Sequence, residues 1–256
     1  MAPLIVHNWC YLANQIGSIS CVILTEGATP KYHTRPATAE TYEKTKRTKV
    51  RVHQRADYAR ETVHGILDAG YVAHVAFVHE DAPVVIPTFY VRDGESILIH
   101  GSRKTRMFKT LASCVPLCAT VTHLDGLVLA RSWFHHSMNY RSVMVHGVAE
   151  EVTGEDARMD AMWKVMEGIA EGRADGSRAP NKQEMKATMI LRIPLDEAVA
   201  KVRRGGPNDD EEDMALPYWA GCVPIEMRHL PPLTSRSMQV DVDVPDAIRA
   251  LGTAGK

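Results

Sequence analysis

The chain has 256 residues, of which 45% are hydrophobic, and its 30 Lys and Arg nearly balance its 31 Asp and Glu, for a formal net charge of −1. This composition predicts a soluble globular protein with one good-sized domain. Because the chain is neutral overall, no global basic field argues for nucleic acid, and any anion site must be local. Five cysteines, an odd and scattered set in a chain too large to need disulfides, favour free thiols and a cytoplasmic location.

Residues 1–54 are predicted to form an N-terminal extension or arm. The best apolar run, Leu4 to Leu24, is interrupted by polar residues and lacks the basic start of a signal peptide, so we expect no membrane partner. Residues 26–56 are rich in Thr, Lys, Arg and Pro and have no sustained period, which is typical of a linker lying on the surface.

The segment from Asp57 onward has regular patterns. "ADYARETVHGILDAG" predicts a helix that ends at Gly70. Strand patterns follow in "YVAHVAFVH", in "PVVIPTFYVRDGESILIHG" and in "PLCATVTHLDGLVLARSWF". The last two are each predicted to be hairpins, turning at Asp93-Gly94 and at Asp125-Gly126. "YRSVMVHGVAEEV" predicts one more strand.

A helix over residues 154–169, a polar loop over 171–184 and a strand over 185–193 come next, and a Pro- and Asp-rich tail begins at residue 231. Many strands joined by tight hairpins, with few helices between them, predict an antiparallel sheet closed into a small barrel. The expected fold class is therefore mainly β with flanking helices. The expected domain spans residues 55–230, and the tail spans 231–256.

The stretch "ILIHGSRKTRMFKTL", residues 97–111, places many basic and hydroxyl side chains where an apolar strand is expected to become a helix. They are Ser102, Arg103, Lys104, Thr105, Arg106 and Lys109. A helix that begins at Arg103 would leave backbone N–H groups free to bind a phosphate. Cations at a helix N-terminus are unfavourable by roughly 0.3–1 kcal/mol each unless an anion is present. The pattern favours a phosphate site, and a solvated basic helix face is the alternative.

The order of the hairpin, "HGSRKTRMFKTL", two strands and "YRSVMVHG" resembles the pyridoxamine 5'-phosphate oxidase-like flavoproteins, and within them the NimA-like, nitroimidazole-resistance-related branch. The resemblance spans roughly Arg55 to Ile225. It implies a six-stranded antiparallel split β-barrel that forms a homodimer. It also implies FMN as cofactor, with its phosphate at the strand-to-helix junction and its ring along the hairpin strands at the dimer interface.

Several positions resemble the family's binding residues. "TRMFKTL" is compared with the family pattern Ser-Arg-Lys, so that Thr105 and Arg106 match and Met107 departs; in "YRSVMVHG", Arg141 and Gly147 match. The flavin-binding residues that the resemblance implies are Ile86, Thr88, His100, Gly101, Ser102, Arg103, Lys104, Thr105, Arg106, Tyr140, Arg141, Ser142 and Trp219.

The resemblance implies an FMN-dependent oxidoreductase that acts on a small organic substrate, with NAD(P)H as a transient reductant. His136 and Arg141 are the candidate catalytic residues. No Arg-Leu pattern follows Trp219, so we do not expect pyridoxamine-phosphate oxidation itself. Two alternatives stay open: haem binding through His135, His136 or His146, and a flavin carrier or sensor without turnover. The histidines show no zinc-like spacing, so no metal site is expected.

Overall fold

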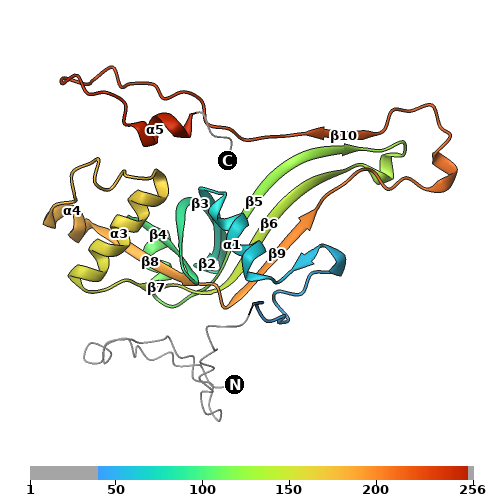
Figure 1. Cartoon of the computed structure of the whole chain (residues 1–256). Coiled ribbons are helices and arrows are strands. Elements are labelled where there is room, and N and C mark those ends of the chain that lie inside the picture. The colour runs from blue at the N-terminus through green and yellow to red at the C-terminus, as the bar shows by residue number, and fades with distance from the viewer. Residues whose placement is uncertain (1–39, 253–256) are drawn as a thin grey trace, which may run out of the picture. The chain divides into compact units, whose positions relative to one another are not determined.

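The computed structural model describes residues 40–252 (Figure 1). Most of the expected N-terminal extension, residues 1–39, and the last four residues of the tail lie outside the described residues. The strands are β1 Ala56–Asp57, β2 Val72–His79, β3 Ala82–Asp93, β4 Ser96–Ser102, β5 Pro116–Leu129, β6 Ser137–Val148, β7 Glu150–Glu151, β8 Thr188–Pro194, β9 Glu197–Arg203 and β10 Gly221–Pro224.

Five α-helices and three short 3-10 helices complete the described chain. They are η1 His53–Arg55, α1 Arg60–Asp68, α2 Arg106–Leu111, η2 Trp133–His135, α3 Glu155–Ile169, α4 Lys182–Ala187, η3 Glu211–Asp213 and α5 Asp246–Leu251. Within residues 40–252, no helix has the length and apolar character needed to cross a bilayer.

The strands form one antiparallel sheet in the order β1-β9-β6-β5-β2-β3-β4-β8-β7, and β10 pairs with β5 outside this path. The expected mainly β, antiparallel fold with flanking helices is confirmed. The described sheet has ten strands rather than six, and its hydrogen-bonded path is open rather than closed. The additional strands include β1, β7 and β10, which have two to four residues each and are too short to give an alternating pattern.

The sheet and the helices bury two apolar clusters. The larger one lies between the inward-facing strand residues and α1, whose Val63, Ile66 and Leu67 are at most 3% exposed. The smaller one lies on the other face of β4 and β8, where Leu98 and Ile190 contact α3. Because both faces of β4 are covered, its residues 96–99 are all buried, which explains the uninterrupted apolar run in the sequence.

The two predicted hairpins have different outcomes. The first is confirmed: β3 and β4 pair antiparallel, and Gly94 has φ +59°, in the left-handed region that glycine adopts without strain. The second is wrong, because β5 runs straight through Asp125-Gly126 with only a bulge. A Cβ at Gly126 would lie 2.9 Å from the Val223 carbonyl oxygen, so this glycine permits the close approach of β10.

Other element boundaries also differ from expectation. Part of the expected arm joins the barrel, since Tyr42 is 3% exposed within the main core and its N–H donates to the Tyr58 carbonyl at 2.8 Å. The expected polar loop contains α4, whose N-cap Asn181 forms a capping box with Glu184. The thiols of Cys118 and Cys222 are free, as expected, but that of Cys114 is not.

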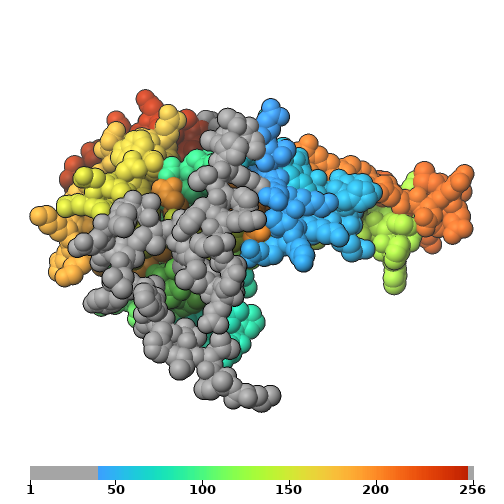
Figure 2. Space-filling view, turned by 90° about the horizontal axis from the view of Figure 1, so that it is seen from below, coloured from blue at the N-terminus to red at the C-terminus, as the bar shows by residue number. Residues whose placement is uncertain are grey.

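Strands β5 and β6 extend well beyond the core, with β10 along one edge (Figure 1). The segment that connects β5 to β6 is yellow-green in Figure 2, and it lies beside the orange segment that connects β9 to β10. Two polar contacts join these segments: an ion pair of Arg131 Nη1 with Asp209 Oδ2 at 2.7 Å, and a hydrogen bond between His135 Nε2 and Asp210 Oδ2 at 3.0 Å. The extended hairpin is therefore braced by chain from far along the sequence.

Candidate functional site

The predicted phosphate-binding residues lie at the end of β4, in the loop between β4 and α2, and at the start of α2. Strand β4 ends at Ser102 and α2 begins at Arg106, so Arg103, Lys104 and Thr105 form the loop. The Thr105 N–H donates to the Ser102 carbonyl at 3.0 Å, and the Lys104 N–H donates to the Ser102 hydroxyl at 3.3 Å. The side chains of Lys104 and Arg106 are exposed. The loop therefore presents cations at the end of a buried strand.

Gly101 lets α2 lie directly against β4. A Cβ at this position would be only 2.4 Å from a ring carbon of Phe108, and Phe108 is itself 3% exposed. Met107 and Leu111 are also buried, so the apolar face of α2 is fixed on the core while its basic residues face outward. The helix begins three residues later than the sequence predicted, because Arg103 to Thr105 make the turn.

Arg103 joins the loop to neighbouring elements. Its N–H donates to the carbonyl of Ala187 at 2.9 Å, at the end of α4. Its Nη2 donates to a carboxylate oxygen of Glu151 at 2.5 Å, and 39% of the Arg103 side chain stays exposed. A guanidinium has five N–H donors in a planar fork, so this pair leaves donors for an anion.

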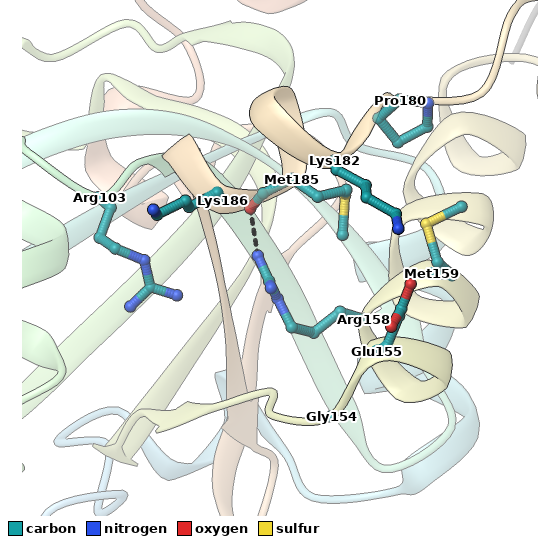
Figure 3. Close-up of a pocket in the computed structure, with 9 residues that line it drawn as sticks. All are labelled: Arg103, Gly154, Glu155, Arg158, Met159, Pro180, Lys182, Met185 and Lys186. Atoms are coloured by element: carbon teal, nitrogen blue, oxygen red, sulfur yellow. Dashed lines mark hydrogen bonds between the residues drawn. The ribbon is translucent and has the colours of Figure 1, made fainter.

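A cavity of about 690 Å³ adjoins Arg103 and lies between α3 and α4 (Figure 3). Its size is within the range of sites for small molecules and cofactors. Four of the lining side chains are cationic, one is a carboxylate, and the rest are apolar or lack a side chain. The lining consists of Arg103, Gly154, Glu155, Arg158, Met159, Pro180, Lys182, Met185 and Lys186.

Two buried nitrogen atoms at this end of β4 have no hydrogen-bond partner within the described residues: His100 Nδ1 and Arg158 Nε. Burial lowers the pKa of His100 below its ordinary value of 6.5, so the imidazole is neutral at pH 7. A buried polar nitrogen without a partner costs roughly 1–3 kcal/mol. The cations and the unpaired N–H of Arg158 Nε fit a phosphate group, which offers several acceptor oxygens.

The predicted flavin-ring contacts lie on the inner face of the sheet. Ile86 packs against the main core, and Thr88 pairs with the buried Ala73 of β2. Side chains alternate along a strand, so Val85 and Pro87 point to the opposite face, where both are exposed. In a single chain, a flavin ring on the outer face of β3 would therefore contact Val85 and Pro87. Ile86 and Thr88 point to the inner face of the sheet instead.

The predicted residues of β6 lie away from the loop, since β5, β2 and β3 separate β6 from β4 in the sheet. Arg141 is held by two hydrogen bonds of 2.9 Å to the Asp125 carboxylate, which raise the pKa of the guanidinium. The Ser142 hydroxyl donates to the Lys201 carbonyl at 3.2 Å. The Tyr140 hydroxyl is buried without a partner in the described residues, and the Lys201 ammonium lies 5.3 Å from its ring centre.

The remaining candidates are on or near the extended hairpin. His136 is exposed to solvent, and its Nδ1 lies 3.0 Å from the Ser132 carbonyl oxygen. His146 of β6 lies opposite Cys118 of β5. Trp219 is 67% exposed and precedes β10, which pairs with the far end of β5. One chain therefore brings together His100 to Arg106, but not Tyr140 to Ser142 or Trp219.

Sequence reasoning missed the α3 and α4 side of the site. The polar loop before residue 185 gave no reason to connect Lys182 and Lys186 with Arg103. The sequence also contains a second match to the family's phosphate-binding pattern. The three residues Ser-Arg-Lys of the family pattern also occur at Ser102, Arg103 and Lys104, three residues before Thr105, and these residues form the strand end and the loop.

The pyridoxamine 5'-phosphate oxidase family model matches residues 59–202, from the start of α1 to β9. The chain belongs to this family. It is a family of flavin-binding split barrels, and its fold agrees with the open antiparallel sheet described above. No curated protein matches the chain.

Among solved structures, the chain is similar to the flavocytochrome Anf3 from Azotobacter vinelandii, with 40% identity, a TM-score of 0.77, and coverage of 81% of this chain and 97% of that one. It is also similar to an FAD- and haem-binding protein from Mycobacterium smegmatis, with 32% identity, a TM-score of 0.74, and coverage of 77% and 97%. A candidate 5-nitroimidazole antibiotic resistance protein from Bacteroides thetaiotaomicron is 16% identical, with a TM-score of 0.49 and coverage of 57% and 86%.

Proposed function

We propose that this member of the pyridoxamine 5'-phosphate oxidase family is a redox protein that binds a flavin phosphate at the loop between β4 and α2. One observation carries the proposal: Arg103, Lys104 and Arg106 crowd a strand end where His100 Nδ1 is buried without a partner in the described residues. The proposal is supported by the 40% identity to a flavocytochrome and by the 32% identity to an FAD- and haem-binding protein.

The flavin supplies the electron-transfer chemistry when it is bound, and the chain supplies binding, orientation and electrostatics. Arg103, Lys104 and Arg106 would hold the phosphate oxygens, and the buried face of α2 fixes the loop. The substrate is a small organic acceptor, with NAD(P)H as a transient reductant. His136 and Arg141 remain the candidate catalytic residues, and the two hydrogen bonds from Arg141 to Asp125 hold its guanidinium in place.

The first experiment is the absorption spectrum of the purified chain and a titration of the flavin-free chain with FMN and with riboflavin. Lys104→Ala and Arg106→Ala should each weaken FMN by roughly 1.5–3 kcal/mol, the scale of a hydrogen bond to a charged group. Riboflavin, which lacks the phosphate, should be weakened much less. Equal losses for both ligands would show that neither side chain contacts the phosphate.

A chain that binds no flavin would refute the proposal. A chain that binds flavin tightly, but is not reduced by NADH or NADPH and passes no electrons to nitro, quinone or imine compounds, would instead be a carrier or sensor.

Haem is a second candidate group, favoured by the haem that both of those similar proteins are named for. A haem-ligating imidazole usually has its second nitrogen held by a carboxylate or carbonyl. His136 fits this description, since its Nδ1 lies 3.0 Å from the Ser132 carbonyl oxygen and leaves Nε2, the less hindered ring nitrogen of this exposed side chain, for the iron. Trp133 and Phe134 beside it are 96% and 88% exposed, and such apolar rings suit a macrocycle.

Haemin titration of the wild-type chain and of His135→Ala, His136→Ala and His146→Ala tests this assignment. We expect a Soret band that one of the three substitutions removes. His53→Ala is the matched control, because His53 is an exposed histidine on η1, outside the extended hairpin. Full haem binding by all three variants would exclude these ligands.

We also propose a homodimer, formed through the outer face of β2 and β3. Val72, Val78 and Val85 on this face are 47%, 55% and 60% exposed, an apolar surface that a second copy would cover. Val78→Glu should shift the sedimentation of the chain from dimer to monomer. Leu233→Glu, in the exposed tail, is the control that should leave the dimer intact. A monomeric wild-type chain would contradict the proposal.

A further inference from the structure

We propose that a small hollow at the end of β9 binds a compact phosphate or diphosphate group, at a site separate from the flavin phosphate. The hollow has a volume of about 280 Å³ and lies between η1, the end of β9 and the turn that follows β9. Four strands, β6, β5, β2 and β3, separate β9 from β4 in the sheet. In one chain the hollow therefore lies away from the loop between β4 and α2.

Three arginines line the hollow: Arg55 of η1, Arg203 at the last position of β9, and Arg204. None of the three forms an ion pair within residues 40–252, and no carboxylate is among the lining residues. The whole chain has a net charge of −1, so this local excess of cations is not part of a basic surface field. Like charges gathered in one place repel one another, and a bound anion removes that cost.

Arg203 carries the strongest indication of an anion. It is 8% exposed, and arginine is seldom buried to this degree unless it is paired. Its guanidinium donates only to neutral acceptors within the described residues: Asn139 Oδ1 at 2.5 Å, the Gly206 carbonyl at 3.0 Å and the Gly205 carbonyl at 3.3 Å. These bonds hold the guanidinium in a fixed position and leave its charge without a counter-ion.

The turn after β9 adds backbone donors. The N–H groups of Gly205 and Gly206 have no acceptor within the described part of the chain. A Cβ at either glycine would meet no atom within 4 Å, so the space beside this backbone is open. Successive backbone N–H groups in a turn form concavities that bind anions, and glycine lets an anion approach the backbone closely.

The rest of the lining indicates the class of ligand. Gln54 and Asn208 add side-chain amides, and Val202 is the single apolar side chain among the lining residues. A nucleoside or another flat ring would find no apolar wall here, and the volume is below the usual range for such ligands. Guanidinium groups bind phosphate oxygens in pairs, and a phosphate offers more acceptor oxygens than a carboxylate does. The hollow therefore fits a compact phosphate or diphosphate, free or at the end of a small molecule.

A ligand in this hollow would act on the extended hairpin. Asp209 and Asp210 follow Gly206 closely in the chain, and they bond to Arg131 and His135 of the connection between β5 and β6. An anion held between η1 and the turn would fix the start of this bracing segment. Because it binds the folded chain, it should also raise the stability of that chain.

The test is a calorimetric titration of pyrophosphate and of inorganic phosphate into the full chain. Saturating FMN occupies the loop between β4 and α2, and the ionic strength is held constant because salt screens exposed charges. The double variant Arg55→Gln/Arg204→Gln keeps Arg203, which fixes the turn, and should lose pyrophosphate affinity by about tenfold or more. Arg51→Gln/Arg236→Gln removes the same charge at exposed positions outside the hollow, and should change the affinity by less than about twofold.

Two further measurements complete the test. Pyrophosphate should raise the Tm of the wild-type chain and of the control variant, and leave that of Arg55→Gln/Arg204→Gln unchanged. Arg204 is exposed, so Arg204→Gln alone provides the comparison if the double variant is unstable. Glycerol 3-phosphate distinguishes the two sources of the group: tighter binding than pyrophosphate indicates a phosphate ester, and weaker binding indicates a free diphosphate.

A wild-type chain that binds none of these phosphates, or variants that bind pyrophosphate as tightly as the wild-type chain, would overturn the inference. Citrate binding as tight as that of pyrophosphate would show that the hollow selects charge alone, and would overturn the assignment to phosphate. Displacement of pyrophosphate by FMN would place the phosphate at the flavin loop and would also overturn it. A chain that binds pyrophosphate but no flavin would refute the proposed function and support this inference.

Discussion

Replacing Gly101 with Ala should destabilise the chain and displace the phosphate loop. An Ala Cβ would lie 2.4 Å from Cε2 of Phe108, whereas ordinary contact begins at 3.4 Å, so the ring or the whole of α2 must move by the difference, 1.0 Å. Phe108 is 3% exposed and packs within the main core. Overpacking of this kind costs roughly 1–3 kcal/mol. The entropy lost by the unfolded chain on changing Gly to Ala offsets about 0.4–1 kcal/mol of that cost.

The net loss of unfolding free energy, measured by urea denaturation, should be centred on about 1.3 kcal/mol and not exceed about 2.6 kcal/mol. Gly147→Ala is the matched control, since its Cβ would meet only the Pro194 carbonyl oxygen at an ordinary 3.8 Å. Adding Phe108→Leu removes the ring edge, so the double variant should lose less than the sum of the two single losses. If Gly101→Ala proves as stable as Gly147→Ala, the close contact between β4 and α2 is not the constraint described here.

Three further predictions concern pH, capping and charge. Burial holds the pKa of His100 below 6.5, so the unfolded chain takes up this proton first, and stability should fall as the pH drops below 6.5. The unfolding free energy should fall by at most about 1.4 kcal/mol per pH unit, and by less than that because solvent still reaches the ring and screens its charge. Urea titrations at pH 7 and 5.5 should show a smaller pH dependence for His100→Gln than for the wild-type chain. Asn181→Ala should lower the unfolding free energy by about 0.5–2 kcal/mol, and no change would mean that the capping box adds nothing. Asp125→Asn should cost at most about 1 kcal/mol, because the Asp125–Arg141 pair is about one-third exposed, and a larger loss would contradict a surface ion pair.

The two Asp-Gly dipeptides explain how much of the fold the sequence could predict. Both follow an apolar strand, and local propensity gives each the same turn signal. Gly94 has a positive φ and makes the turn, whereas Gly126 is a glycine because β10, about a hundred residues later in the chain, passes against it. Local patterns find a strand and its alternation. They do not reveal a partner strand that is distant in the sequence and only four residues long.

The same limit applies to the site. The basic cluster at residues 102–106 was visible because cations at a strand end are unusual in a neutral chain. Lys182 and Lys186 were not visible as partners, because α4 packs beside the loop only after β8 pairs with β4. His100 was chosen by resemblance, and only the structure explains its neutral state, which follows from burial. Charge patterns therefore indicated Arg103 alone among the residues that line the cavity, and tertiary packing brings the others to it.

Two strands, β2 and β10, pair with different parts of the same edge of β5. Near its start, Leu117 to Thr120 pair with β2, and its last residues, Gly126 to Leu129, pair with β10. Without β10 the far half of that edge would present unpaired backbone N–H and C=O groups beside the exposed Leu127, an open template for other chains. We therefore expect the segment from Gly221 to Pro224 to protect this edge from pairing with other chains. A chain cut before Gly221 should fold the rest of its sheet and then aggregate through the unpaired edge of β5.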